Sequence, residues 1–377
     1  MTTDTDVTVG AAVRELRKRY GWGQKDLAER SGLKHAQTVS EVEKGRRSLK
    51  ASEVVELAAL FHVPAADLLA GRVSRRSSFV LWREPVDSSA RREIEARFID
   101  RCKRFAFLEE IAGGFGRPRL PSYSIDFESA RFEEAEEIAA EVRNTLQLGE
   151  AAAKSLREDI ESRWGVMVFQ ELMDNGSGAT TRGEFGSAIL ENAKEPPKRR
   201  AFSLAHELFH LLTWGDDPRP VGGESEGSSR RREQLANAFA AALLMPGETL
   251  KRKIAGRRIR GPADLLPTAA AIGVSVPALA WRSVNLGLLA RELVEKVLDS
   301  PDKLGVADRG WVPPAELNQP LPERYVSLAY AAYMRGDISI GRLAELLETT
   351  VGMVEHRLDA YGLDLDADEF QAEVLPA

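Results

Sequence analysis

The nine residues LAHELFHLL, numbered 204 to 212, constrain the fold and the chemistry of this chain more than any other stretch. Their apolar residues recur at helical spacing, so the segment predicts a helix that is buried in a core. His206 and His210 are four residues apart and therefore share one helical face. Burying two imidazoles beside the carboxylate of Glu207 is costly unless a partner compensates them. The alternative is a core helix with tolerated polar residues.

The H-E-x-x-H spacing indicates a catalytic metal site. His206 and His210 can each direct a ring nitrogen at one ion, as Zn²⁺ requires at about 2.0–2.1 Å. Glu207 then lies beside the ion, where it can take a proton from the attacking water. The chain has only five histidines, so the number of chance matches is on the order of 0.01. We expect Zn²⁺ as the default cofactor, with Mn²⁺ or Fe²⁺ as alternatives.

A catalytic zinc site needs a third protein ligand, and Glu233 is the candidate. It follows His210 by 23 residues, at the expected start of the helix EQLANAFAAALLMP. Ala236, Ala240 and Ala241 would let that helix approach the metal helix closely. The alternative for Glu233 is an ordinary acid in a first helical turn, where it complements the helix dipole.

Two motif blocks resemble the ImmA/IrrE metallopeptidases, which are gluzincin-like enzymes with HExxH and a downstream glutamate in an E-x-x-A-N-x-F-A context. The blocks are RRAFSLAHELFHLL and EQLANAFAAALLMP, and the similarity covers about residues 133–250. The resemblance implies that His206, His210 and Glu233 are metal ligands, that Glu207 is the catalytic base, and that Asn237 at most supports a ligand from behind. It also implies a protein substrate, such as a transcriptional repressor, in a stress, phage or mobile-element response.

Three other features near the expected metal site leave alternatives open. Residues 186–191 are expected as a strand whose exposed edge could hold an extended peptide by strand addition; a purely structural strand is the alternative. The polar loop 220–229 either flanks the cleft or is a disordered surface loop. Tyr123 and Arg182 are both candidates for stabilising an oxyanion, and the sequence does not choose between them.

Residues 9–71 predict four or five short helices that carry excess positive charge. The first 80 residues hold fourteen Lys/Arg against ten Asp/Glu, a balance of +4 that leaves −10 for residues 81–377. A basic head on an acidic body suggests that a polyanion would bind at this end. The stretch GQKDLAERSGLKHAQTVSEVEKGRR has the layout of a helix-turn-helix, with Gly32 permitting the turn. It resembles the lambda-repressor-like (XRE) family over about residues 9–70.

In this arrangement the head is expected to bind double-stranded DNA. Four residues at the exposed start of the recognition helix could meet base edges, namely His35, Gln37, Thr38 and Glu41. Four others could contact phosphates, namely Gln24, Lys44, Arg46 and Arg47. The alternative is a solvated charged face on a small helical interaction domain.

Length and composition set further bounds. A chain of 377 residues suggests about two to three domains. No apolar run approaches the ~18 residues that would span a bilayer, and the polar start MTTDTDVTVG is no secretory signal. Cys102 is the only cysteine, which excludes an internal disulfide and fits a reducing cytoplasm. We expect a cytoplasmic protein without a membrane segment, and a homodimer is one alternative for its oligomeric state.

The predicted fold class is mainly α with a small β-sheet (α+β). It comprises an N-terminal lambda-repressor-like helix-turn-helix, a zincin-like peptidase domain and a C-terminal helical domain, with strands expected at VMVFQEL and GSAILENA. The expected divisions are an XRE domain at 9–71, a linker and long helix at 72–128, the metallopeptidase domain at 129–255, a helical extension at 256–310 and a small helical domain at 324–365. That last domain hints at helix-turn-helix geometry, but its acidic charge favours a structural or protein-binding role.

Together these features predict a DNA-binding transcriptional regulator that carries a zinc-dependent endopeptidase. The main alternative is a DNA-binding regulator whose peptidase fold senses a metal or ligand and cleaves nothing. A third possibility is self-cleavage that separates the head from the body.

Overall fold

The computed structural model forms two compact units, Met1–Phe79 with Asp216–Arg230, and Val80–Gly215 with Arg231–Ala377. It describes residues 4–19, 22–61, 65–71, 79–82, 88–113, 120–215, 226–254, 256–298 and 311–365. The described part is mainly helical and contains one four-stranded sheet, as the sequence predicts. The expected loop residues 220–225 lie outside the described residues.

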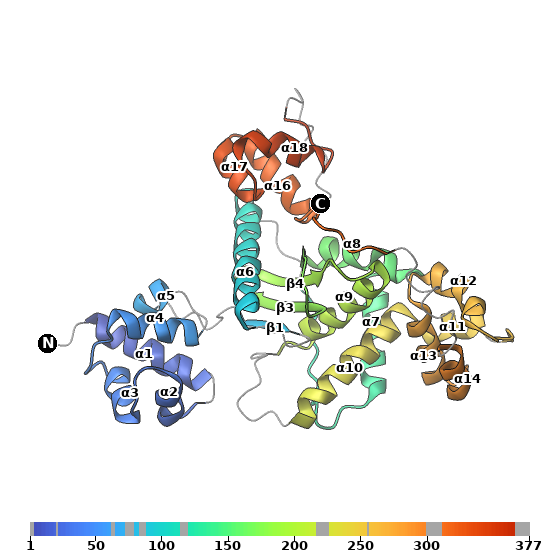
Figure 1. Ribbon diagram of the computed structural model, residues 1–377, viewed down its shortest axis with the longest axis horizontal. Helices are drawn as coiled ribbons and strands as arrows, with labels where there is room; N and C mark the ends of the chain where they lie inside the picture. The colour runs from blue at the N-terminus through green and yellow to red at the C-terminus, as the bar shows by residue number, and fades with distance from the viewer. Residues whose placement is uncertain are drawn as a thin grey trace. The chain divides into compact units, whose positions relative to one another are not determined.

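The N-terminal head is a bundle of five helices (Figure 1). Their apolar faces meet in a core that includes Leu16, Leu27 and Leu57, each fully buried. Such burial along one stripe of each short helix is the main source of stability for helices of this length. The helices are α1 (Asp4–Arg19), α2 (Gln24–Arg30), α3 (Ala36–Glu43), α4 (Ala51–Leu60) and α5 (Ala65–Leu69).

A close helix approach and a tight turn shape the head. A Cβ on Gly10 of α1 would lie 2.2 Å from the carbonyl oxygen of Val42, so only glycine lets α1 cross α3 at this distance. The turn between α2 and α3 is made differently from our expectation. Its left-handed residue is Lys34, with φ 58°, and Gly32 does not have a positive φ. The expectation that Gly32 supplies the turn conformation was therefore wrong.

The second unit is built on the sheet, whose strand order is β1-β3-β4-β2. The strands are β1 (Phe79–Trp82), β2 (Met167–Glu171), β3 (Gly178–Gly183) and β4 (Gly186–Asn192). β2 pairs with β4 in parallel, and β3 pairs with β4 as an antiparallel hairpin in which Gly183 faces Gly186. The sequence predicts β2 and β4 but not β1 or β3. Because β4 has a paired neighbour on both sides, the expectation of an exposed peptide-binding edge at residues 186–191 was wrong.

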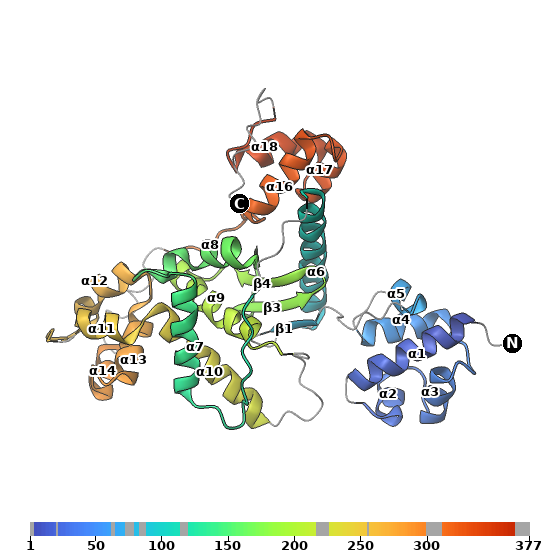
Figure 2. The ribbon, with the colours of Figure 1, turned by 180° about the vertical axis from the view of Figure 1, so that it is seen from behind.

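The two faces of the sheet belong to two different cores. Side chains alternate between the faces of a strand, and Val168 and Ile189 accordingly pack with helices α7 to α10. Their neighbours Phe169 and Leu190 face the opposite core. The helices on the first face are α7 (Phe132–Thr145), α8 (Ala152–Trp164), α9 (Pro197–Leu212) and α10 (Glu226–Leu244), and Figure 2 shows them from behind.

The second face is covered by one long helix and by the C-terminal helices. α6 (Ser88–Ile111) carries Phe98, Cys102 and Phe105 into this core. Cys102 is fully buried, and burial raises the pKa of its thiol well above the ordinary value. Three helices and a single 3₁₀ turn complete the layer: α16 (Glu323–Met334), α17 (Ile340–Leu346), η1 (Val351–Met353) and α18 (Val354–Asp359). The helix expected within the linker segment 72–128 is thus part of the packed core.

Four further helices extend the first core beyond α10: α11 (Gly247–Ile254), α12 (Pro262–Ile272), α13 (Val276–Asn285) and α14 (Arg291–Leu298). Among the described residues, no single helix is long and apolar enough to cross a membrane. One pair, α12 with α13, meets the length and composition criteria only when taken together and is bent by 96°.

An ion-pair cluster of Arg101, Glu171 and Glu348, here called the Arg101 cluster, links elements on the second face of the sheet. The guanidinium of Arg101 on α6 donates to Glu171 of β2 at 2.9 Å and to both oxygens of Glu348, which follows α17, at 2.7 and 2.6 Å. Arg101 is only 6% exposed. Burial alone would lower its pKa, but the two carboxylates outweigh burial and raise it.

We predict that Arg101→Met lowers the free energy of unfolding of the full chain by about 2–3 kcal/mol, since it leaves two partly buried carboxylates without their cation. Urea unfolding followed by circular dichroism measures this change. Lys103→Met, at an exposed position on the same helix, is the control and should alter stability by no more than about 0.5 kcal/mol. Equal effects of the two substitutions would show that the cluster contributes nothing beyond surface charge.

Candidate metal centre

Helix α9 carries the H-E-x-x-H motif in the interior of the second unit. It begins at Pro197, where a proline is tolerated because the first helical N–H needs no partner. All residues from 203 to 212 are buried. His206, Glu207 and His210 are 0%, 1% and 3% exposed. Because burial removes water from these three polar side chains, they need hydrogen-bond, ionic or metal partners in the protein.

The structure brings His206, His210 and Glu233 together. The two Nε2 atoms are 3.1 Å apart. Glu233 Oε2 lies 3.1 Å from His206 Nε2, and Glu233 Oε1 lies 3.4 Å from His210 Nε2. Donor atoms about 2.0–2.1 Å from one tetrahedral zinc ion would be separated by about 3.3 Å. These three residues therefore have the spacing and the donor types of a divalent-metal site, and their donor atoms all lie within 4.8 Å of one another.

Asn237 orients the first of the two imidazoles. Its Oδ1 lies 3.0 Å from His206 Nδ1, and an amide oxygen can only accept a hydrogen bond. His206 Nδ1 therefore carries the proton, which leaves the Nε2 lone pair directed at the cluster. His210 differs, because its Nδ1 is buried and has no hydrogen-bond partner among the described residues.

Glu233 comes from α10, as the sequence predicts, but the expectation that it lies in the first turn of that helix was wrong. The helix begins at Glu226, so residues 226–229 of the expected loop are helical and Glu233 lies in the second turn. Burial would raise the pKa of Glu233, but when the two imidazoles are protonated, their hydrogen bonds and charges lower it overall. Ala236 and Ala240 are fully buried in the core that α9 and α10 share.

Glu207 is held by β3, a strand that sequence reasoning missed. Thr180 Oγ1 donates to Glu207 Oε2 at 2.5 Å, while Glu207 Oε1 is buried without a hydrogen-bond partner among the described residues. A Cβ on Gly178 would lie 3.1 Å from Glu207 Cγ. Gly183 and Gly186, which flank the two-residue hairpin turn, are the sequence signal that could have revealed this strand.

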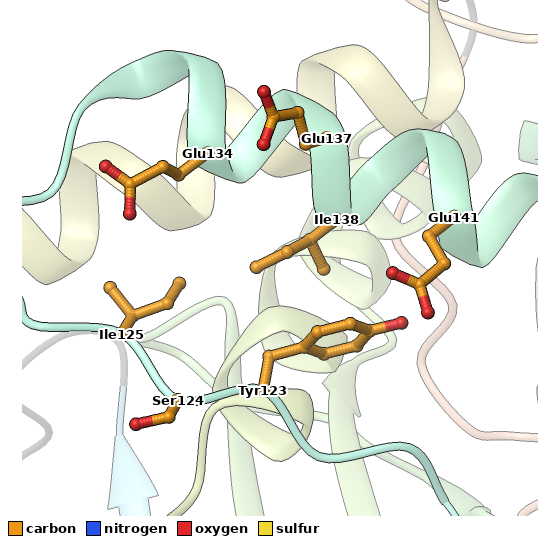
Figure 3. A pocket seen from close by; sticks show the side chains of 7 residues that line it. All are labelled: Tyr123, Ser124, Ile125, Glu134, Glu137, Ile138 and Glu141. Atoms are coloured by element: carbon orange, nitrogen blue, oxygen red, sulfur yellow. The ribbon is translucent and has the colours of Figure 1, made fainter.

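The two oxyanion candidates lie in different places. Tyr123 lines a pocket of about 240 Å³ between α7 and the segment before it (Figure 3). Burial, together with a hydrogen bond to Glu141, raises the pKa of Tyr123 to about 12, so its hydroxyl is committed to that carboxylate. Arg182 lies two residues beyond Thr180 on β3 and so shares its strand face.

In the head, three of the residues expected to read bases, His35, Gln37 and Thr38, lie at the N-terminal end of α3, whereas Glu41 lies near its C-terminal end and not at its start as expected. His35 is the N-cap of α3, and His35 and Gln37 are exposed. Thr38 and Glu41 are half-buried.

The residues expected to contact phosphates fall into two groups. Lys44 and Arg46 are exposed, and Arg46 lies 3.7 Å from a carboxylate oxygen of Glu41. Arg47 instead pairs with Glu53 at 2.7 Å, and the amide of Gln24 donates to the buried Glu43 at 2.9 Å. The side chains of Lys44 and Arg46 are therefore the more accessible members of this set.

Two family matches agree with these units. Residues 13–68 match the sequence model described as "Helix-turn-helix", and residues 161–282 match the peptidase-family model described as "IrrE N-terminal-like domain". The chain thus combines a helix-turn-helix domain of XRE type with an IrrE-like metallopeptidase domain. One relative is the "Radiation response metalloprotease IrrE" of Deinococcus deserti, which is 44% identical over 66 residues. The match spans 16% of this chain and only 24% of that relative.

Proposed function

We propose that His206, His210 and Glu233 bind one zinc ion and that the peptidase unit is a zinc-dependent endopeptidase. The observation that carries this proposal is the convergence of two imidazole nitrogens and one carboxylate at 3.1–3.4 Å. Two buried imidazoles and a half-buried carboxylate that face one another at this distance favour a cation between them, because a cation gives each lone pair a partner. Mn²⁺ and Fe²⁺ suit the same two-histidine, one-carboxylate set.

Glu207 is the proposed base of amide hydrolysis. A bound zinc ion would supply Lewis-acid chemistry for this reaction. Glu207 has one carboxylate oxygen tied to Thr180 and a second without a partner among the described residues. Its carboxylate takes a proton from the attacking water and passes it to the leaving amine nitrogen as the C–N bond breaks. Asn237 holds the His206 ring in the tautomer that the ligand role requires.

We further propose that the head docks on double-stranded DNA, so that the protein acts in the cytoplasm as a transcriptional regulator. Lys44 and Arg46 contact phosphates, while His35, Gln37, Thr38 and Glu41 face base edges. Binding at DNA favours a DNA-bound protein, such as a repressor, as the substrate. We expect the domains of this regulator to be divided near residues 71, 128, 255 and 310.

A DNA-binding regulator that holds the metal but cleaves nothing is the alternative function. Both functions predict DNA binding and metal binding, so only turnover separates them. Intact Glu207, beside the metal ligands and bonded on one oxygen only, favours turnover.

The metal assignment predicts that purified protein contains one zinc per chain and that Glu233→Ala loses at least 10-fold in zinc affinity, because one of three ligands is removed. Elemental analysis and competition with a chromophoric chelator measure this. Gln234→Ala, at an exposed neighbouring position on α10, is the matched control and should keep the affinity of the unaltered chain. Full zinc affinity in Glu233→Ala would exclude Glu233 as a ligand.

The mechanism predicts that Glu207→Gln keeps zinc but loses about 100-fold or more in kcat, since the amide cannot accept the proton. A pool of fluorescence-quenched decapeptides reports cleavage in trans, and intact mass before and after zinc addition reports self-cleavage. Undiminished cleavage by Glu207→Gln would reject this mechanism. Zinc binding without cleavage by the unaltered chain in either assay would favour the sensor.

The DNA assignment predicts strong salt dependence. About four phosphate contacts give a slope near −3.6 for log affinity against log salt concentration, and removing two contacts reduces it to about −1.8. Fluorescence anisotropy with a mixed-sequence 30-base-pair duplex compares the unaltered chain with the Lys44→Gln/Arg46→Gln double variant. Lys103→Gln, on α6 of the other unit, is the control. A slope near zero for the unaltered chain contradicts DNA binding.

A further inference from the structure

Strand β3 presents a distinctive face to the H-E-x-x-H helix. One side of the strand carries every second residue, namely Gly178, Thr180 and Arg182. Thr180 is 0% exposed, and both Gly178 and Thr180 lie directly against Glu207. None of the other described strands supplies a hydrogen bond to this carboxylate. β3 is therefore the support on which the side chain of Glu207 rests.

The hydrogen bond from Thr180 distinguishes the two oxygens of Glu207. Oε2 accepts the threonine proton at 2.5 Å, and Oε1 is left without a hydrogen-bond partner among the described residues. The same hydroxyl also lies 3.4 Å from the backbone carbonyl of Glu207. A β-branched threonine has few χ1 choices in a strand, so its hydroxyl is a well-defined anchor.

Gly178 restricts Glu207 from a second direction. A Cβ at position 178 would lie 3.0 Å from the carbonyl oxygen of Leu190 and 3.1 Å from Glu207 Cγ. The first of these atoms is backbone of the paired strand β4 and cannot move aside easily. The stem of Glu207 therefore occupies the space that any larger residue at position 178 would need.

We propose that Thr180 is a positioning residue for the Glu207 carboxylate, and that Gly178 provides the space in which it is positioned. By binding Oε2, Thr180 fixes the terminal rotation of the carboxylate and leaves Oε1 as the oxygen that exchanges protons. This inference rests on the proposed role of Glu207 as the base. It adds that the precision of this base comes from β3 and not from α9 alone.

The test compares two substitutions of similar shape. Thr180→Val removes the hydroxyl at nearly constant volume, and Thr180→Ser keeps it. We expect Val to lower kcat for the decapeptide pool about 10- to 100-fold with KM within twofold and the zinc content unchanged, because a misplaced base slows the chemical step alone. Ser should restore kcat to within about threefold. Wild-type kcat in Thr180→Val, with Glu207→Gln inactive, would overturn the inference and leave the proposed function intact.

A second readout does not depend on turnover. In the metal-free protein, Thr180→Val should lower the thermal midpoint, because the buried carboxylate loses its donor. In a Glu207→Ala background the same substitution should change the midpoint much less, since the hydroxyl then has only its long contact with the backbone carbonyl of residue 207 to lose. Additive effects in the two backgrounds would show that the contact is not made. If Thr180→Val does not fold, Gly178→Ala perturbs Glu207 from the other side, and an unchanged kcat in that variant would overturn the proposal.

Discussion

The close approach of two buried imidazoles and one half-buried carboxylate is the constraint on which the peptidase unit depends. Their donor atoms lie 3.1–3.4 Å apart, and neutral imidazole nitrogens at that distance repel unless a cation or a shared proton lies between them. α9 supplies two of these donors at i and i+4, so the third can come only from another element that packs closely on it. α10 supplies that third donor and shares a core with α9, where Phe209 and Phe239 are in contact, so the packing of two helices is tied to the chemistry of the site.

The sheet separates this chemistry from the rest of the unit. One face packs on α9 and α10, where the cluster lies, and the other face packs on α6 and the C-terminal helices. The Arg101 cluster lies in the second layer, so it can fix the sheet without contributing charge to the site itself. A rigid sheet in turn holds Thr180 and Gly178 in place against Glu207. The C-terminal helices therefore support the site indirectly, through the strands.

Sequence reasoning located the parts of the site that lie on one helix or within one motif. His206, Glu207 and His210 follow from the 3.6-residue period of α9, and Glu233 was found by its distance and by the alanines that follow it. The start of α10 was missed because ESEGSSRRR resembles a loop in composition, although the residues from Glu226 onward are helical. The prediction that β4 has an exposed edge was wrong because the order of strands in a sheet depends on their partners, which a local sequence pattern does not specify.

β3 was missed for the same physical reason that makes it useful. GATTRG carries glycines at both ends and an arginine, so its local propensity for a strand is weak, and glycine within a strand ordinarily costs stability. Its strand geometry comes from pairing with β4, and Gly178 is compatible with the fold because Glu207 fills the space beside it. A segment that departs from local strand preference, yet is fully paired and buried, is where a structural requirement other than stability is expected to act. In this chain, that requirement is the placement of one carboxylate beside three converging donor atoms.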